Sequence, residues 1–180
     1  MNDIRSDGTL KELLRHAKEL AVRYYELTGK PLGVTGEIAE YEASEKLGLV
    51  LAPPRTGGFD VYRRQGDFVE RFQVKGLAVS TDNRYRGRVP KINCNGAFEA
   101  VLLVLLDRSS FEAIEIWRAE REPVISRLTA PGSKARNERG SMGIRQFRSI
   151  ARCVWPQQGG KPPLLQDPPV SSPAEILRGE

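Results

Sequence analysis

The clearest pattern along this chain is a pair of alternating segments on either side of a short polar turn. Apolar and polar residues alternate from Phe59 to Arg64 and again from Phe68 to Lys75, and this period of two predicts two β-strands. Gly66-Asp67 lies between them and suits a two-residue type II′ turn. We therefore expect the two strands to form a β-hairpin.

A turn at Gly66-Asp67 also fixes which residues face one another. The expected pairs are Phe59 with Val74, Asp60 with Gln73, Val61 with Phe72, and Arg63 with Glu70. Because side chains alternate along a strand, Gln73 and Lys75 share a face, and both lie within roughly 5 to 8 Å of Asp60. The other face is apolar and is expected to pack on the core, with Phe59, Val61, Phe72 and Val74. A carboxylate, an amide and an ammonium therefore converge on the polar face.

Two amphipathic helices are expected before this hairpin. Thr9 and Glu12 form a capping box, and a stripe ending before Gly29 predicts a core helix, with Leu10, Leu13, Leu14, Ala17, Leu20, Tyr24 and Leu27. The second helix runs from a capping Thr35 to Gly48. Within it Glu40 follows the inward spacing of Ala43 and Leu47, whereas Glu42 and Glu45 project elsewhere. Glu37, one turn before Glu40, is the alternative inward acid.

The second half of the chain predicts further strands and helices. Ala100 to Leu106 is a short apolar run typical of a strand covered on both faces, and Phe111 to Trp117 alternates like a neighbouring strand. Helices are expected near Glu122 to Leu128 and from Ile144 to Val154, and Pro131 to Ser141 reads as a loop. The order of elements predicts an α/β fold, a mixed central β-sheet flanked by helices.

Composition agrees with one domain over residues 1–156, followed by a proline-rich tail over 157–180 that we expect to be disordered. No apolar stretch reaches the 18 or more residues of a membrane span, and no secretory signal precedes the first helix, so a cytoplasmic location is expected. Cys94 and Cys153 have no Cys-x-x-Cys partner, which argues against a zinc site. His16 is the single histidine, so the sequence offers almost no residues for a Ser-His-Asp or Cys-His catalytic mechanism.

The net charge of +5 is unevenly distributed. Four basic residues, Arg84, Arg86, Arg88 and Lys91, follow the hairpin in a loop-like stretch without an acid among them. A second basic run contains only Glu138 in opposition, with Lys134, Arg136, Arg139, Arg145, Arg148 and Arg152. Such charge runs are usually solvated surface, but beside a phosphodiesterase-like site they favour contact with nucleic-acid phosphates. Phosphate contacts carry no base sequence information.

The polar face of the hairpin offers the groups that phosphodiester hydrolysis requires. A hard cation must be held by oxygen ligands, chiefly carboxylates, to polarise the phosphate and lower the pKa of water. Asp60 supplies one ligand, and the Gln73 oxygen or a backbone carbonyl could supply another. Lys75 could orient water or stabilise charge on the phosphate. The simpler interpretation is a surface hairpin with a weak Asp–Lys ion pair.

Helix, hairpin and spacing over residues 35–76 resemble the PD-(D/E)XK nucleases, the restriction-endonuclease-like superfamily. The matching residues are a helical Glu, then Gly58-Phe59-Asp60, then Gln73-Val74-Lys75. The resemblance implies a restriction-endonuclease-like core in which Asp60 and Gln73 bind the metal and Lys75 assists hydrolysis. It also implies a helical metal ligand and favours Glu40 over Glu37. Phe59 stands where the signature has Pro, and Gln73 where it has an acid.

These residues predict a Mg²⁺-dependent nuclease, with Mn²⁺ as a substitute, that acts on DNA rather than RNA in restriction, repair or junction processing. We expect an endonuclease, and no membrane partner. A homodimer would suit cleavage of both strands of a duplex, although the sequence marks no interface for it. The first alternative is a nucleic-acid-binding module that kept the scaffold and lost turnover through Gln73. The second is an interaction protein without a nucleic-acid role.

Overall fold

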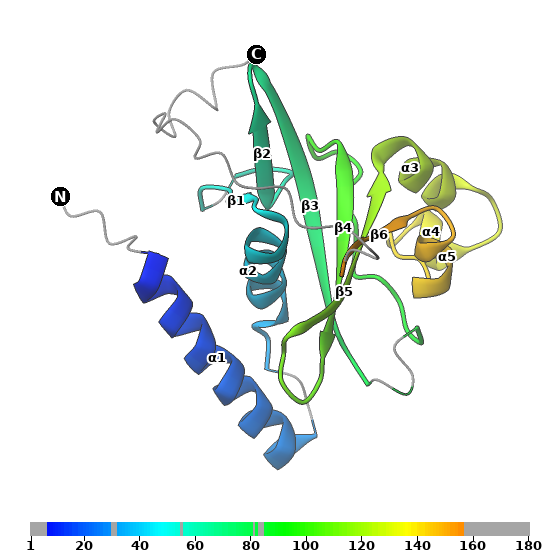
Figure 1. The fold of residues 1–180 in the computed structure, drawn as a ribbon. Helices are drawn as coiled ribbons and strands as arrows, with labels where there is room; N and C mark the ends of the chain where they lie inside the picture. The colour runs from blue at the N-terminus through cyan, green and yellow to red at the C-terminus, as the bar shows by residue number, and fades with distance from the viewer. Residues whose placement is uncertain (1–6, 30–31, 55, 81, 83–84, 157–180) are drawn as a thin grey trace.

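The computed structural model describes residues 7–29, 32–54, 56–80, 82 and 85–156, and it has a six-stranded mixed sheet flanked by helices (Figure 1). The expected α/β class with a mixed sheet is confirmed. The strands lie in chain order: β1 (Val50–Leu51), β2 (Val61–Gln65), β3 (Phe68–Val79), β4 (Ala100–Asp107), β5 (Ala113–Glu120) and β6 (Arg152–Trp155). All neighbours are antiparallel except β3 and β4, which are parallel. The expected tail over 157–180 lies outside the described residues.

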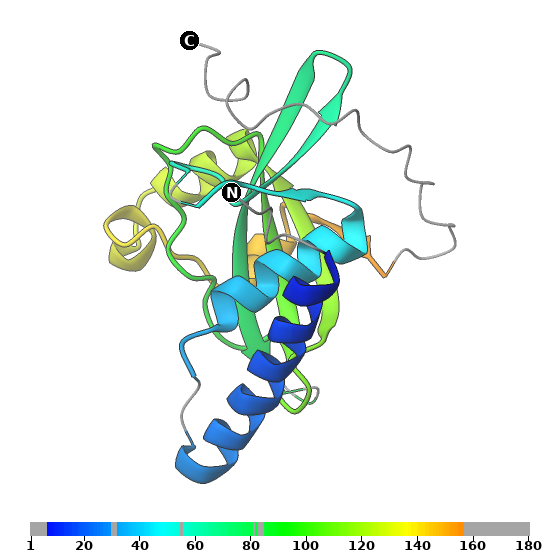
Figure 2. The same ribbon diagram turned by 90° about the vertical axis from the view of Figure 1, so that its left-hand side faces the viewer.

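Helices cover both faces of this sheet (Figures 1 and 2). On one face lie α1 (Asp7–Thr28) and α2 (Thr35–Leu47), with α2 next to the strands. On the other lie α3 (Arg121–Thr129), α4 (Lys134–Asn137) and α5 (Ile144–Arg148). The two apolar layers are filled by alternate residues of β4, so that Leu102 and Val104 face α2 whereas Leu103 and Leu105 face the opposite way. The continuous apolar run of β4 is explained by this double burial.

The predicted hairpin register is confirmed from Val61 to Phe72. Val61 pairs with Phe72 and Arg63 with Glu70, and Gly66 has a φ of 60°, as the turn requires. The ladder fails before Val61, because the Asp60 N–H also donates to the Phe72 carbonyl, at 2.8 Å. Two residues thus oppose one, which is the arrangement of a β-bulge. As a result Phe59 packs in the apolar layer opposite to that of Val61, and the prediction that they share a face was wrong.

The first helix is not the core helix that its stripe predicts. Ala21 is fully buried, and Val22 packs against the core, but five stripe residues are exposed: Leu10, Leu13, Leu20, Tyr24 and Leu27. The helix is instead held by its neighbouring face, which carries Lys18 and Ala21. Apolar periodicity identified the helix correctly but not the side that contacts the rest of the chain.

The final predicted helix was wrong in its second half. α5 ends at Arg148, with Ile144 and Phe147 buried as expected, and the chain then forms β6. Cys153 pairs with Trp117 across the edge of β5. Pairing with an open sheet edge satisfies the backbone groups that a continued helix would have bonded internally. The helix at Arg121–Thr129 is confirmed, and the expected loop contains the short α4. No helix among the described residues is long and apolar enough to cross a membrane.

Candidate active site

The bulge before β2 determines where the Asp60 carboxylate points. Its Oδ2 accepts a hydrogen bond of 2.7 Å from the Val74 N–H, on the edge of β3 beyond the last residue paired with β2. In a strand, the N–H and C=O of one residue point to the same side, so the Val74 carbonyl lies on this edge too. Asp60 therefore has one oxygen fixed by the backbone and the other available beside a carbonyl.

A glycine brings the second acid to the same place. A Cβ on Gly76 would lie 2.5 Å from the Ala39 Cβ and 2.7 Å from the Thr35 carbonyl oxygen, so α2 rests directly on the backbone of β3. Glu40 follows Ala39 in the helix and is half-buried, while Glu37 is exposed. The close approach of helix and strand accounts for the proximity of Glu40 to Lys75, the residue before Gly76.

The charges of these groups act on one another. Burial, reinforced by the neighbouring carboxylates of Asp60 and Glu37, raises the pKa of Glu40 from 4.5 to about 7, against the opposing effect of Lys75. Burial also lowers the pKa of Lys75, although Asp60 and Glu40 act in the opposite direction. Two carboxyl groups and an ammonium group therefore share a half-buried space, with Glu37 at its margin. Perturbed groups in such a cluster are typical of functional sites.

Gln73 points into the protein rather than toward solvent. Only 3% of the residue is exposed, and its Oε1 accepts a 2.8 Å hydrogen bond from the Asn93 N–H. Its Nε2 donates to the carbonyls of Gly58 and Asn93, at 3.3 and 3.2 Å. The amide thus ties β3 to the segment before Asp60 and to the β3–β4 connection. A ligand role for Gln73 stays a prediction, and these contacts give it a positioning role.

The groups near Asp60 determine which kind of divalent cation site could form there. Within the described ranges, no group of three or more His, Cys, Asp or Glu side chains is arranged to hold a metal. Mg²⁺, however, is usually held by one or two carboxylates and keeps several waters. Burial is the main cause of the raised pKa of Glu40, and the repulsion from Asp60 that adds to it would be relieved by a cation between the two carboxylates. Two carboxylates and the Val74 carbonyl therefore fit Mg²⁺ and do not fit a closed site of four protein ligands.

The acid that sequence analysis set aside on α2 is the most buried one. Glu42 accepts a hydrogen bond of 2.8 Å from the Lys18 Nζ and another of 3.0 Å from the Ala113 N–H, and it is only 3% exposed. Lys18 also contacts Glu112 at 2.5 Å. This buried ion pair joins α1, α2 and β5 and lies apart from the Asp60 cluster in its contacts. As expected, Glu42 points away from the Asp60 cluster. Its burial was not expected from the sequence.

The basic loop is only partly free to bind a ligand. Arg84 lies outside the described residues, whereas Arg86, Arg88 and Lys91 are exposed. The Arg88 guanidinium donates to the Ser141 carbonyl and, at 3.3 Å, to its hydroxyl, which joins the loop to the segment before α5. In the second basic run, Arg148 stacks on Tyr85 at 3.7 Å and therefore has a structural role.

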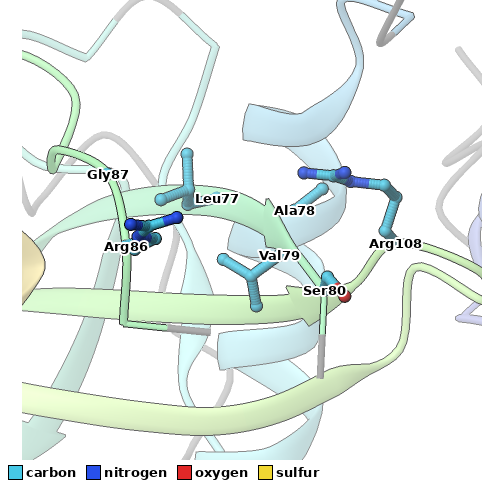
Figure 3. Close-up of a pocket in the computed structure, with 7 residues that line it drawn as sticks. All are labelled: Leu77, Ala78, Val79, Ser80, Arg86, Gly87 and Arg108. Carbon is cyan, nitrogen blue, oxygen red and sulfur yellow. The ribbon is translucent and has the colours of Figure 1, made fainter. Parts of the chain in front are cut away.

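A pocket of about 360 Å³ opens at the end of β3, between Arg86 and Arg108 (Figure 3). Leu77, on the same face of β3 as Lys75, lines it together with Ser80 and Gly87. The Arg108 guanidinium donates to the Tyr25 hydroxyl at 3.2 Å. None of the described residues that line this pocket is acidic, so it suits an anion. Sequence analysis missed Arg108, whose only signal was its place just after the apolar strand β4.

Comparison with protein-family models and with curated proteins found no match to this chain.

Proposed function

We propose that this protein is a Mg²⁺-dependent nuclease that acts on DNA and that its sheet and α2 form a restriction-endonuclease-like core of the PD-(D/E)XK kind. The observation that carries the proposal is the seating of α2 on β3 at Gly76, which brings the half-buried Glu40 to the edge where Asp60 is held and where Lys75 lies. The raised pKa of Glu40 and the lowered pKa of Lys75 agree with this arrangement. A surface ion pair between Asp60 and Lys75 would not require a second, partly buried acid. The arrangement therefore favours a metal site over the simpler interpretation of a solvated hairpin.

The roles follow from the contacts of each group. Asp60 and Glu40 would hold Mg²⁺, with the Val74 carbonyl on the same edge, and Mn²⁺ would substitute. Bound there, the cation supplies the polarisation of the phosphate and the lowered pKa of water that hydrolysis needs. Lys75, whose burial favours loss of its proton, would orient the attacking water or neutralise charge on the phosphate. Gln73 would position Asp60 by holding the carbonyl of Gly58.

The DNA backbone would be bound along the end of β3. Arg86 and Arg108 flank a pocket that begins at Leu77, two residues beyond Lys75 on the same face of the strand. Along a strand this separation is roughly 7 Å, so one DNA strand could reach both places. We assign this pocket to a phosphate next to the one being cleaved, with Lys91 as a further contact outside it.

A second candidate is a nucleic-acid-binding module that has lost turnover. It is favoured by the engagement of Gln73 with three backbone groups and by the lack of a three-ligand metal group in the described part of the chain. Such a module would retain the basic pocket but take up no Mg²⁺ at Asp60 and Glu40. The two candidates therefore differ in metal binding and cleavage, not in DNA affinity.

The decisive experiment measures cleavage of supercoiled, linear and branched DNA with Mg²⁺, Mn²⁺ or EDTA. We expect Asp60→Asn and Lys75→Met to lower the cleavage rate by on the order of a hundredfold or more. Asp60→Asn can still accept the Val74 hydrogen bond, so the fold should persist. Glu45→Gln, on the exposed side of the same helix as Glu40, is the matched control and should remain active. Full activity in both site variants would overturn the proposal.

Calorimetry separates the second candidate. A nuclease should bind Mg²⁺ with an affinity that rises as pH increases through 7, because Glu40 must lose its proton, and Glu40→Gln should weaken this binding. A binding module should bind DNA equally well with and without Mg²⁺.

The salt dependence of DNA binding tests the basic pocket. Arg86→Gln with Arg108→Gln should reduce the slope of log affinity against log salt concentration by about one unit per lost phosphate contact. Arg64→Gln, at an exposed position, should have less effect.

A further inference from the structure

The longest helix of the described chain leaves most of its apolar stripe in solvent. The exposed fractions are 61% for Leu13, 59% for Leu20 and 86% for Leu27, and Leu10 and Tyr24 are each 38% exposed. Single exposed leucines are common on protein surfaces, but a contiguous row of large apolar residues usually marks a contact surface. We call these residues, with the half-buried Ala17, the α1 stripe.

The rest of the chain is bound by a different side of this helix. Ala21 is fully buried, Lys18 reaches Glu42 at 2.8 Å, and the Tyr25 hydroxyl accepts from Arg108. Figures 1 and 2 show α1 outside α2, with its C-terminal end extending past the sheet. α1 is therefore anchored to the domain while the α1 stripe faces outward, available to a partner.

The spacing of the stripe is that of a two-helix coiled-coil seam. Its residues follow steps of three and four in alternation over about 26 Å of helix: Leu10, Leu13, Ala17, Leu20, Tyr24 and Leu27. This series of steps is the same when read from either end of the helix. An identical helix running antiparallel would therefore match every position of the α1 stripe.

The side chains matched in this way are complementary in size. Antiparallel pairing sets Leu10 against the partner's Leu27, Leu13 against the partner's Tyr24, and Ala17 against the partner's Leu20. The smallest residue thus faces a leucine, as interdigitated packing requires. A parallel pair would instead set Ala17 against the partner's Ala17 and leave a gap at the centre of the seam.

Charges beside the stripe agree with the same orientation. Glu12 and Arg23 are exposed and lie on one flank of the helix, separated by three turns. In the antiparallel pair Arg23 comes within reach of the partner's Glu12, and two-fold symmetry repeats this contact at the other end. In a parallel pair this flank would face the opposite flank of the partner helix, so Arg23 and the partner's Glu12 would not meet.

We propose that the α1 stripe is the interface of a homodimer, formed by α1 of two copies of this chain packed antiparallel about a two-fold axis. The contact is isologous, so it closes at two copies and leaves no apolar stripe for a third. This inference does not rest on the proposed nuclease activity. It provides the interface that the hairpin and basic-loop patterns did not identify.

The mass of the full chain in solution tests the dimer. Light scattering should give twice the 20.1 kDa of one chain, and Leu13→Glu with Leu20→Glu should return the mass to that of a monomer while the circular dichroism spectrum keeps its helical signal. Phe68→Glu is the matched control, because Phe68 is 56% exposed but lies at the hairpin turn, and it should remain dimeric. A monomeric wild-type chain, or a dimer that survives the double substitution, would overturn the proposal. A monomer in which the α1 stripe is covered would also contradict the dimer, and it would indicate residues 157–180 of the same chain as the occupant.

Disulfide trapping tests the orientation and does not depend on the glutamate variants folding. In chains carrying Cys94→Ser and Cys153→Ser, one population receives Leu10→Cys and the other Leu27→Cys. Antiparallel packing predicts rapid cross-linking only when the two populations are mixed. Cross-linking of either population with itself would indicate a parallel pair and contradict the assigned orientation.

Discussion

Gly76 and Ala39 are in such close contact that a methyl group on Gly76 would approach the Ala39 Cβ to 2.5 Å. The contact seats α2 on β3 and thereby sets the distance of Glu40 from Lys75. A side chain at position 76 must push the helix away, because the nearby Thr35 carbonyl oxygen belongs to the backbone and cannot rotate aside.

Gly76→Ala should therefore lower the free energy of unfolding by about 1 to 3 kcal/mol, the range for overpacked cores. Urea denaturation measures this change. Gly36→Ala is a matched control in α2, the helix that packs on Gly76, since a Cβ at Gly36 meets nothing within 4 Å. That control should stabilise by about 0.5 to 1 kcal/mol through helix propensity. Equal effects of the two substitutions would contradict the close contact.

The raised pKa of Glu40 predicts a pH-dependent stability. The folded chain holds the Glu40 proton more tightly than the unfolded chain, so this contribution is fully present below pH 4.5 and is lost as the pH rises through about 7. Glu40→Gln should match the wild type near pH 4.5 and exceed it at pH 8. The shift would correspond to about 3 kcal/mol for a fully buried group, and solvent screening of the half-buried carboxyl reduces the expectation to roughly 1 to 2 kcal/mol.

Thermal unfolding without divalent metal, at pH 4.5 and pH 8, measures this difference. Glu45→Gln should show no comparable gain at pH 8, because Glu45 is exposed on α2. A Glu40→Gln chain that is less stable than the wild type at both pH values would mean that the carboxyl makes a stabilising contact instead of a strained one.

The ion pair between Lys18 and Glu42 should contribute far more to stability than its exposed neighbour. Lys18→Met leaves a nearly buried carboxylate without its cation, and we expect a loss of about 2 to 4 kcal/mol. Lys11→Met removes a pair with Glu45 at 3.7 Å in which both side chains are exposed, and it should cost less than about 0.5 kcal/mol. Denaturant midpoints of the two variants give the comparison, and similar values would contradict the burial of Glu42.

The hairpin shows how far local pattern determines structure here. Alternation and the glycine turn fixed the register from Val61 to Phe72, because both are properties of neighbouring residues. The bulge at Asp60 was not predictable, since it depends on a hydrogen bond from Ala52 to the Asp60 carbonyl and on the packing of Phe59 against the opposite layer. The one-residue shift changed the face of Phe59 and replaced the expected pairing of Asp60 with Gln73 by a hydrogen bond from the Val74 N–H to the Asp60 carboxylate.

The helices show a second limit. Apolar spacing located α1, but the side that contacts the domain is decided by Ala21 and Lys18, whose partners are distant in sequence. For Glu40, the helical spacing predicted the correct face of α2. The close approach of α2 to Gly76, which the spacing does not show, buries the carboxyl and thereby raises its pKa. No sequence pattern marks Arg108, because its pocket forms only where the β3–β4 connection returns to the end of β3.

Gln73→Glu distinguishes a positioning amide from a metal ligand. The Nε2 donates to the carbonyls of Gly58 and Asn93, and a carboxylate there would place oxygen against oxygen at about the same 3.2 to 3.3 Å. Since the residue is 3% exposed, water cannot compensate, and we expect a loss of about 2 to 4 kcal/mol at pH 8. The loss should shrink at pH 5, because burial favours the protonated acid, which can still donate one hydrogen bond.

The same variant measured with saturating Mg²⁺ completes the test. If position 73 only positions the loop, the stability lost at pH 8 should persist in Mg²⁺, and cleavage should fall with it. Gln146→Glu is the control, since the Gln146 oxygen accepts from the Gly143 N–H and a carboxylate can do the same. Recovery of stability and stronger cleavage in Mg²⁺ would instead show that an acid at position 73 enters the metal site, and the hydrogen bonds seen for the amide would then describe only the metal-free state.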